Sequence, residues 1–284
     1  MVMTREERIK RERIKQRRKK RRIRRLLQIT VWTGIIVAAL VTGRTAMKFL
    51  AAQLNNAFGT GQMSAKDLEE TDTYKEIFEN RTLYPETMLE ALEKNPEIQD
   101  FVRNYPDSEP VVQGGISDEE KAEEHPLFLQ WDARWGYVPY GDDNIGLSGC
   151  GPACLSMVIF SLTRNENATP DAIAGYSMDM GYYEYGAGTS WNLMTDAATQ
   201  YGVMAGELAL DEGIMKNHLD SGHMIICSMG PGDFTTTGHF IVIYGYDQDG
   251  FLVNDPYSRI RSNKTWDYDT ISGQIRAMWV YSAG

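Results

Sequence analysis

One cysteine, Cys150, lies between two glycines at the point where an apolar helical pattern begins. Apolar residues recur at positions 155, 158, 159 and 162, which is the spacing of one buried helical face. Pro152 suits the first turn of such a helix, where its missing N–H costs nothing. Cys150 is therefore predicted at a helix N-terminus, where free N–H groups and the helix dipole favour a thiolate. A nucleophilic thiol and a small buried turn residue both fit this placement.

A nucleophilic thiol needs a base within hydrogen-bonding distance, and the base needs a group that orients it. Of the four histidines, His239 stands out because it begins a strongly apolar predicted strand, 238–246. A second predicted strand, 251–254, ends at Asp255, and the turn at 247–250 folds that acid back toward His239. The strand register is open by a few residues, and a structural histidine is the alternative interpretation.

The other two cysteines have different surroundings. Cys154 falls on the apolar face of the predicted helix and Cys227 lies in an apolar strand pattern, so both are expected to be buried thiols. Three cysteines are an odd number, which argues against a disulfide framework. Cys150 and Cys154 are one helical turn apart, which is a poor geometry for a disulfide bond.

The charge of the chain is divided unevenly. The formal net charge is -10, yet the first 25 residues hold 14 Lys and Arg against three Glu. The remainder therefore holds 15 of the 29 basic residues and 36 of the 39 acidic ones. A basic tail on an acidic body indicates that the two parts meet different surroundings.

The basic tail is followed by 18 residues without a charge, 26–43, rich in Ile, Val and Leu. As a helix this segment spans about 27 Å, enough for a bilayer core when Arg44 and Lys48 extend toward the headgroups. The positive-inside rule then places the tail in the cytoplasm and the acidic body outside. A cleaved signal peptide is the alternative to an uncleaved signal anchor. Anionic lipid, rather than nucleic acid, is the expected partner of the tail.

Between the span and the main domain, the sequence predicts short amphipathic elements. Residues 44–66 resemble a partly helical stalk, and Pro85 and Pro96 each open a short helix. Because such helices are too short to be stable alone, they should dock on the main domain or on each other. Residues 106–124 read as a solvated acidic linker.

The main domain, 126–284, begins with helical patterns and ends with strand patterns. Helices are predicted at 150–162, 171–178, 190–198 and 211–219, and strands at 224–229, 238–246, 251–254 and 278–281. A helical half that carries the cysteine, followed by an antiparallel sheet that carries the histidine, is an α+β fold. The predicted domains are thus the cytoplasmic tail (1–25), the transmembrane anchor (26–43), the stalk and linker (44–125) and this domain.

Five motifs occur in a fixed order and identify a family resemblance. They are Gln130-Trp131-Asp132-x-Arg134-Trp135, Ile145-Gly146-x-Ser148-Gly149-Cys150-Gly151-Pro152, Gly188-Thr189-Ser190-Trp191, Gly238-His239-Phe240 and Asn254-Asp255-Pro256. In these motifs the chain resembles papain-like cysteine peptidases related to the bacteriocin-processing peptidase domains of ABC exporters, which cut after double-glycine leaders. The resemblance covers roughly residues 127–284 and implies a papain-like fold.

The resemblance also implies roles for four residues. Cys150 would be the nucleophile, His239 the general base and acid, and Asp255 the residue that orients the imidazole. Gln130 would donate to the oxyanion beside the backbone N–H of Cys150. Because Gln130 lies 20 residues before Cys150, farther than in the exporter type, Asn144 is a second candidate for that donor. No cofactor and no metal is implied.

We therefore expect a membrane-anchored, extracytoplasmic cysteine peptidase that acts on a peptide or protein substrate. A cell-wall peptide amidase or endopeptidase, or an acyl transferase, would use the same three residues. A surface domain that binds peptides without cutting them is the alternative from another functional class. A Cys–His–Asp set favours catalysis, because peptide binding alone does not require one.

Overall fold

The computed structural model describes residues 65–69 and 71–284, which fall within one compact unit, Met63–Gly284. The predicted basic tail (1–25) and the predicted membrane span (26–43) lie outside the described residues. Among the residues that are described, no helix combines the length and the apolar character needed to cross a bilayer.

A six-stranded antiparallel sheet forms one half of the unit. Its strand order is β5-β10-β6-β7-β8-β9, so the C-terminal strand lies between two strands that precede it in sequence. The strands are β5 (Val203–Glu207), β6 (Met224–Met229), β7 (His239–Tyr246), β8 (Phe251–Asn254), β9 (Thr265–Trp266) and β10 (Ile275–Ala283). Two small ribbons pair β1 (Pro139–Tyr140) with β2 (Asp143–Asn144), and β3 (Tyr183–Glu184) with β4 (Gly188–Thr189).

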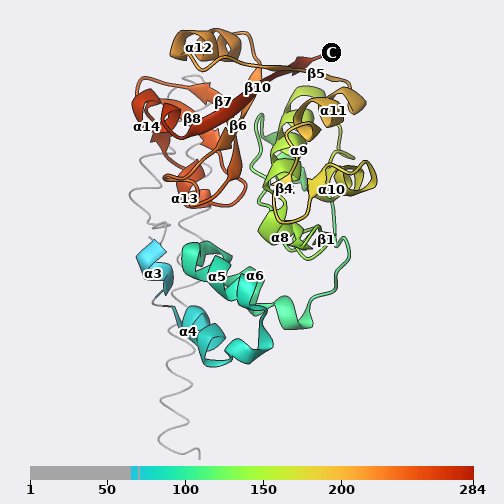
Figure 1. Cartoon of the computed structure of the whole chain (residues 1–284), viewed down its shortest axis with the longest axis vertical. Helices are drawn as coiled ribbons and strands as arrows, with labels where there is room; N and C mark the ends of the chain where they lie inside the picture. Colours follow the sequence, from blue (N-terminus) through green and yellow to red (C-terminus); the bar gives the residue numbers. More distant parts are fainter. Residues whose placement is uncertain (1–64, 70) are drawn as a thin grey trace, which may run out of the picture. The chain divides into compact units, whose positions relative to one another are not determined.

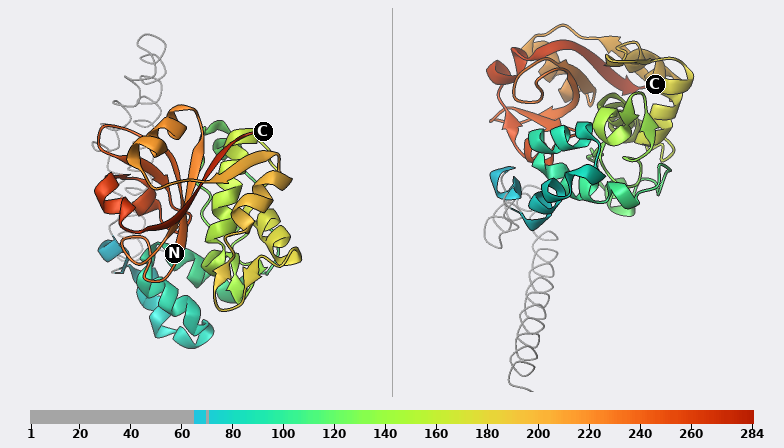
Figure 2. Two further views of the ribbon diagram at one scale, coloured as in Figure 1. Left: turned by 45° about the horizontal axis from the view of Figure 1, so that its top comes forward. Right: turned by 60° about the horizontal axis from the view of Figure 1, so that its bottom comes forward.

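Helices form the other half, beside the sheet (Figures 1 and 2). They are α8 (Ile145–Ser148), α9 (Cys150–Thr163), α10 (Pro170–Asp179) and α11 (Leu193–Gln200). Three more helices are associated with the strands, namely α12 (Glu212–Asp220), α13 (Arg259–Ser262) and α14 (Tyr268–Ser272). The α+β fold predicted from the sequence is confirmed.

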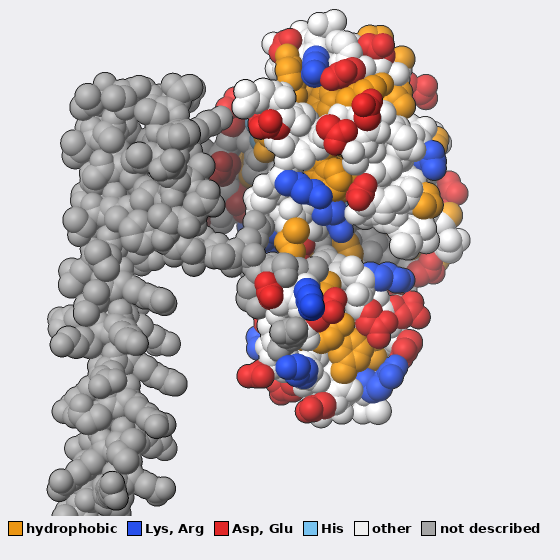
Figure 3. Space-filling model, turned by 90° about the vertical axis from the view of Figure 1, so that its left-hand side faces the viewer, with side chains coloured by type: hydrophobic (Ala, Val, Ile, Leu, Met, Phe, Trp, Pro, Cys, Tyr) orange, Lys and Arg blue, Asp and Glu red, His pale blue; other side chains and the backbone are white. Residues whose placement is uncertain are grey.

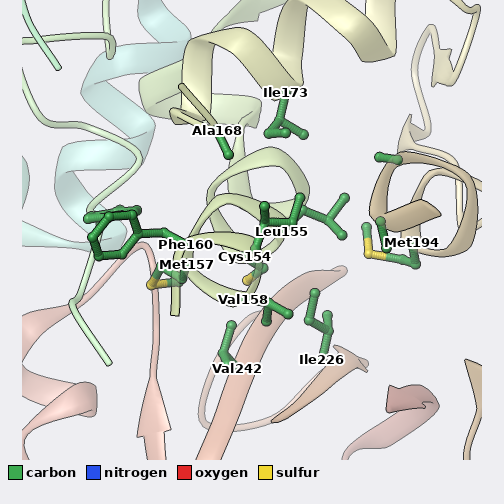
Figure 4. Close-up of a cluster of buried hydrophobic side chains, with 14 of the residues drawn as sticks. Cys154, Leu155, Met157, Val158, Phe160, Ala168, Ile173, Met194, Ile226 and Val242 are labelled. Atoms are coloured by element: carbon green, nitrogen blue, oxygen red, sulfur yellow. The ribbon is translucent and has the colours of Figure 1, made fainter. Parts of the chain in front are cut away.

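Helix α9 is the centre of the largest hydrophobic core. The sequence predicted one buried face, but every residue from Gly151 to Phe160 is buried. The reason is that α9 has neighbours on several sides. Val158 packs toward Ile226 and Val242 of the sheet, while Ile173 of α10 and Met194 of α11 cover the helix elsewhere (Figure 4). This packing holds the N-terminus of α9, and hence Cys150, in a fixed position.

The helices upstream of residue 126 pack on this unit. They are α3 (Ala65–Glu69), α4 (Asp72–Glu79), α5 (Glu86–Lys94) and α6 (Gln99–Arg103), with short 3₁₀ turns η1 (Arg81–Leu83), η2 (Pro96–Ile98) and η3 (Tyr105–Asp107). Leu89, Leu92 and Phe101 of these helices share a buried cluster with Trp131 and Tyr137. The expectation that the helices opened by Pro85 and Pro96 dock on the main domain is therefore confirmed.

Polar contacts add to this apolar docking. The side-chain amide of Asn95 donates to the Tyr257 carbonyl oxygen over 2.6 Å. The Glu97 carboxylate accepts from the backbone N–H of Arg259 over 2.8 Å and from the Ser258 hydroxyl. Glu97 thus supplies acceptors at the N-terminus of α13, where backbone N–H groups lack helical partners. The upstream helices hold the loop that follows β8.

The acidic segment 106–124 is mostly exposed, as expected of a solvated linker, but part of it is more ordered than its composition indicates. Residues Asp118–Ala122 form helix α7, whose Ser117–Glu120 capping box is complete. Arg134 binds Glu120 through both terminal nitrogens, at 2.6 and 2.7 Å, and its carbonyl oxygen accepts from the Gln113 N–H. An arginine in the first motif therefore fixes the acidic segment, which composition alone did not reveal.

Figure 3 shows one face of the unit, on which acidic and basic side chains are interspersed with small apolar patches. No single-sign surface dominates this face. On this face the acidic side chains are therefore spread out rather than gathered into one patch.

Replacing Glu97 with alanine should loosen the loop that follows β8. The change removes the acceptor of the Arg259 N–H and the Ser258 hydroxyl, so the free energy of unfolding should fall by about 1–2 kcal/mol. Thermal unfolding should then occur about 2–4 °C lower for each kcal/mol lost. Glu109→Ala, at an exposed loop position, is the matched control. Equal melting temperatures for the two variants would contradict this role of Glu97.

Candidate active site

A cleft of about 390 Å³ opens between the helical half and the sheet half of the unit. Cys150 contributes from the N-terminus of α9, and His239 from the start of β7. The loop 232–238 that joins β6 to β7 forms one side, and residues of α5 close another. Segments far apart in the sequence therefore meet around one thiol and one imidazole.

His239 and Asp255 are in direct contact. The Nε2 atom of His239 lies 2.8 Å from Oδ1 of Asp255, and both side chains are buried. Strand β8 pairs with β7 so that Asn254 faces Val242, which places the residue after β8 near the start of β7. Because Nε2 faces the carboxylate, Nδ1 is the nitrogen that remains for Cys150.

Asp255 is fully buried, at 0 % exposure, and three donors surround its carboxylate. Besides His239, the backbone N–H of Tyr257 donates to Oδ1 over 2.8 Å and Nε of Arg261 donates to Oδ2 over 2.5 Å. Burial opposes the negative charge, but His239 and Arg261 outweigh it and hold the pKa of Asp255 below its usual value. The carboxylate therefore stays charged.

Sequence reasoning missed Arg261. It lies six residues after Asp255, in α13, and nothing in the local pattern distinguishes it from a solvated arginine. Only the fold of the loop turns its guanidinium back onto the carboxylate.

The charge state of His239 follows from these neighbours. Burial lowers its pKa, but the Asp255 carboxylate and the interaction with the Cys150 side chain raise it more, to about 9. His239 is therefore an imidazolium ion at neutral pH. This cation lies at the cleft that Cys150 also lines.

Cys150 differs from the other two cysteines in its exposure. It is partly exposed and lines the cleft, whereas Cys154 and Cys227 are fully buried. Burial raises the pKa of both buried thiols, so these two are held neutral. The expectation that Cys154 and Cys227 are buried thiols is confirmed.

Gln130 lies in the cleft beside Cys150, and Asn144 does not. The Gln130 side chain is buried, and Nε2 donates one hydrogen to the Gly146 carbonyl oxygen over 2.9 Å, which leaves its second hydrogen for another acceptor. The Asn144 side chain instead caps α8 by accepting from the Leu147 N–H over 3.1 Å. Cys150 is the first residue of α9, so its own N–H has no partner within the helix. Of the two side chains predicted as oxyanion donors, Gln130 is the one that lines the cleft with Cys150.

The described residues contain no group of three or more His, Cys, Asp or Glu side chains arranged to hold a metal ion.

The chain is similar to one protein family and to several solved structures. A model of the Peptidase_C39 like family matches residues 123–284. No curated protein matches. Among solved structures, the peptidase domain of Streptococcus ComA, described as a bi-functional ABC transporter involved in a quorum sensing pathway, is 16 % identical, with a TM-score of 0.39. That match covers 48 % of this chain and 93 % of the ComA domain. A C39-like peptidase from Bacillus anthracis is 15 % identical, with a TM-score of 0.37, over 61 % of this chain and 99 % of the other.

The family match contains Cys150, His239 and Asp255, and it begins just before Gln130. It extends over more than half of the sequence and to its last residue. The chain therefore belongs to the Peptidase_C39 like family.

Proposed function

We propose that this protein is a cysteine peptidase in which Cys150 is the nucleophile, His239 the acid and base, and Asp255 the residue that orients His239. The observation that carries the proposal is the 2.8 Å contact between His239 and a fully buried Asp255, at the cleft that Cys150 also lines. A histidine with a purely structural role does not need a thiol at the same cleft. It also does not need a second cation, here Arg261, to keep the carboxylate of its partner charged.

In the first half of the reaction, the Cys150 thiolate attacks the substrate carbonyl carbon and forms a C–S bond. The carbonyl oxygen becomes an oxyanion, which the Cys150 N–H and the free hydrogen of Gln130 Nε2 stabilise. His239 gives its proton to the leaving amine as the C–N bond breaks. The product is a thioester on Cys150 and a free amine.

In the second half, neutral His239 takes a proton from water, and the resulting hydroxide attacks the thioester. The C–S bond breaks, the carboxylic acid product leaves, and the thiolate and imidazolium are restored. Asp255 remains ionised throughout and stabilises His239 whenever His239 is protonated. An amidase or acyl transferase would share these steps and differ in the substrate or in the group that accepts the acyl chain.

We further propose that residues 26–43 anchor the enzyme in the cell membrane with the peptidase domain outside. The support is the uncharged 18-residue stretch and the basic residues that precede it. A peptidase held in this way would meet peptide or protein substrates near the cell surface.

The thiol of Cys150 should react with iodoacetamide at neutral pH much faster than the thiols of Cys154 and Cys227. The reason is that Cys150 is accessible beside a cation, while the other two are fully buried. Mass spectrometry of tryptic peptides after short exposure measures each rate. Cys150→Ala should remove the fast reaction, and equal slow rates at all three positions in the native protein would contradict the nucleophile assignment.

His239→Ala should reduce peptide cleavage by about 10²–10⁴-fold, the usual contribution of a general acid and base. Mass spectrometry of a peptide library digested by the full chain, with Cys150→Ala as the blank, measures the loss. Circular dichroism confirms that the fold survives. Activity retained in a folded His239→Ala protein would exclude His239 as the base.

Activity should decline as the pH rises through about 9, because His239 then loses the proton that the leaving amine needs. Its pKa in the folded protein lies above the ordinary value of 6.5, so its contribution to stability is complete below 6.5 and is lost between 6.5 and about 9. Asp255→Asn should move the alkaline limb of the pH–rate profile to lower pH, since the carboxylate raises the pKa of His239. A limb that stays near 9 in that variant would contradict this.

If residues 26–43 are an uncleaved anchor, the mature protein should remain in the membrane fraction with its basic tail attached. N-terminal sequencing of the membrane-bound protein tests this. A new N-terminus after Gly43 would show that the segment is a cleaved signal peptide.

A further inference from the structure

A second hollow lies next to the cleft and is larger, at about 650 Å³. Neither Cys150 nor His239 lines it. Part of its lining comes from the upstream helices and turns, through residues such as Pro85, Met88 and Tyr105, and part comes from Tyr137, Pro139 and the β1–β2 ribbon. This hollow is larger than the cleft that contains Cys150, so its position relative to Cys150 decides whether a substrate could occupy both.

The two hollows meet at three residues that line both of them: Thr87, Asp143 and Leu147. Thr87 comes from α5 and Asp143 from β2, and the Thr87 hydroxyl donates to Asp143 Oδ1 over 3.2 Å. Leu147 lies three residues before Cys150 in the chain. The larger hollow, which we call the outer groove, therefore adjoins the Cys150 cleft at the Thr87–Asp143 contact.

The side chains of the outer groove differ from those of the cleft. The cleft is lined by two basic residues, Lys94 and Arg261, and two acidic ones, Asp143 and Asp233, whereas among the described residues the only charged side chains that line the outer groove are the carboxylates of Asp142 and Asp143. The remaining lining is mainly proline, tyrosine, leucine and methionine, and Leu83 at its edge is 58 % exposed. The chemical complement of such a surface is an apolar chain segment that carries a cation.

The wall formed by α5 is held firmly in place. Leu89 and Leu92 of α5 are buried against the peptidase part, and Asn95, directly after the helix, is bonded to the Tyr257 carbonyl oxygen. Glu97 binds the Arg259 N–H, four residues beyond Asp255. The same contacts therefore fix both the wall of the outer groove and the loop that carries Asp255. A groove with rigid walls binds an extended chain at a lower entropic cost than one that must first assemble.

We propose that the outer groove is a substrate subsite for an extended polypeptide segment with a lysine or arginine among apolar residues. The substrate chain runs from Cys150 past Thr87 and Asp143 into the groove, where Asp142 and Asp143 bind the cation. The upstream helices, which lie outside the family match at 123–284, thereby form part of the specificity of the enzyme. This proposal rests on the proposed peptidase function, since it describes a substrate of the same site.

The test uses the full chain in detergent and pairs of short library peptides that differ by Lys or Glu at one position. At one or two adjacent positions beyond those that fill the Cys150 cleft, the peptide with Lys should be cleaved about tenfold faster, in kcat/KM, than the peptide with Glu. This value assumes about threefold to fivefold from each of the two carboxylates, of which Asp142 is exposed and Asp143 is partly buried. The Asp142→Asn, Asp143→Asn double variant should lose the preference. Asp269→Asn removes one exposed carboxylate that lines neither hollow, and it should keep the preference.

A binding measurement separates this proposal from the proposed function. Fluorescence anisotropy of the same labelled peptides with Cys150→Ala reports affinity without cleavage, and the Lys peptide should bind more tightly than the Glu peptide. If the Lys peptide binds more tightly but the native chain cuts neither peptide, the result supports the subsite and contradicts the peptidase function. If the native chain cuts the Lys and Glu peptides equally fast whichever position carries the change, the result supports the peptidase function and contradicts the subsite.

Other occupants of the groove are also outcomes of this experiment. Binding of a synthetic peptide of residues 1–25, in the absence of any binding by the Lys library peptides, would assign the groove to the chain's own basic tail. Self-association of Cys150→Ala that blocks peptide binding would assign it to a second copy. Either result would overturn the proposal. A preference for Lys that survives in the double variant would overturn it as well.

Discussion

The buried carboxylate of Asp255 is the constraint on which the site depends. A charge removed from water is costly unless opposite charges and hydrogen bonds replace the lost hydration. Here the replacements are the His239 imidazolium, the Arg261 guanidinium and the Tyr257 N–H. They can meet only if β7, β8 and α13 take their observed positions. The electrostatic requirement of one side chain therefore links the sheet, the loop after β8 and the state of His239.

The thiol side of the site depends on packing rather than on charge. Helix α9 is covered by the sheet and by α10 and α11, so its first residue cannot shift without disturbing the largest core. Cys150 remains partly exposed because it lies at the end of the helix, where the core stops and the cleft begins. Cys154, one turn further along, is inside the core and is held neutral by burial. Position along a single helix therefore separates a thiol that lines the cleft from one that is buried in the core.

The upstream helices extend the site beyond the part that the family model matches. They contribute Thr87 and Lys94 to the cleft and Met88 and Tyr105 to the outer groove. Through Glu97 and Asn95 they also bind the loop that follows Asp255. The same short segment therefore lines both hollows and supports the loop that carries the buried carboxylate.

The sequence by itself determined the α+β class, the helix that begins at Cys150, the strands that carry His239 and precede Asp255, and the burial of Cys154 and Cys227. These follow from local periodicity, turn residues and the order of the motifs, which are properties of neighbouring positions. Only the tertiary structure decided that Gln130 rather than Asn144 faces the cleft, that Arg261 binds Asp255, and that the acidic segment around Glu120 is fixed by Arg134. Each of these depends on where a loop or helix turns in space, and contacts between residues distant in the chain leave no periodic signal in the sequence.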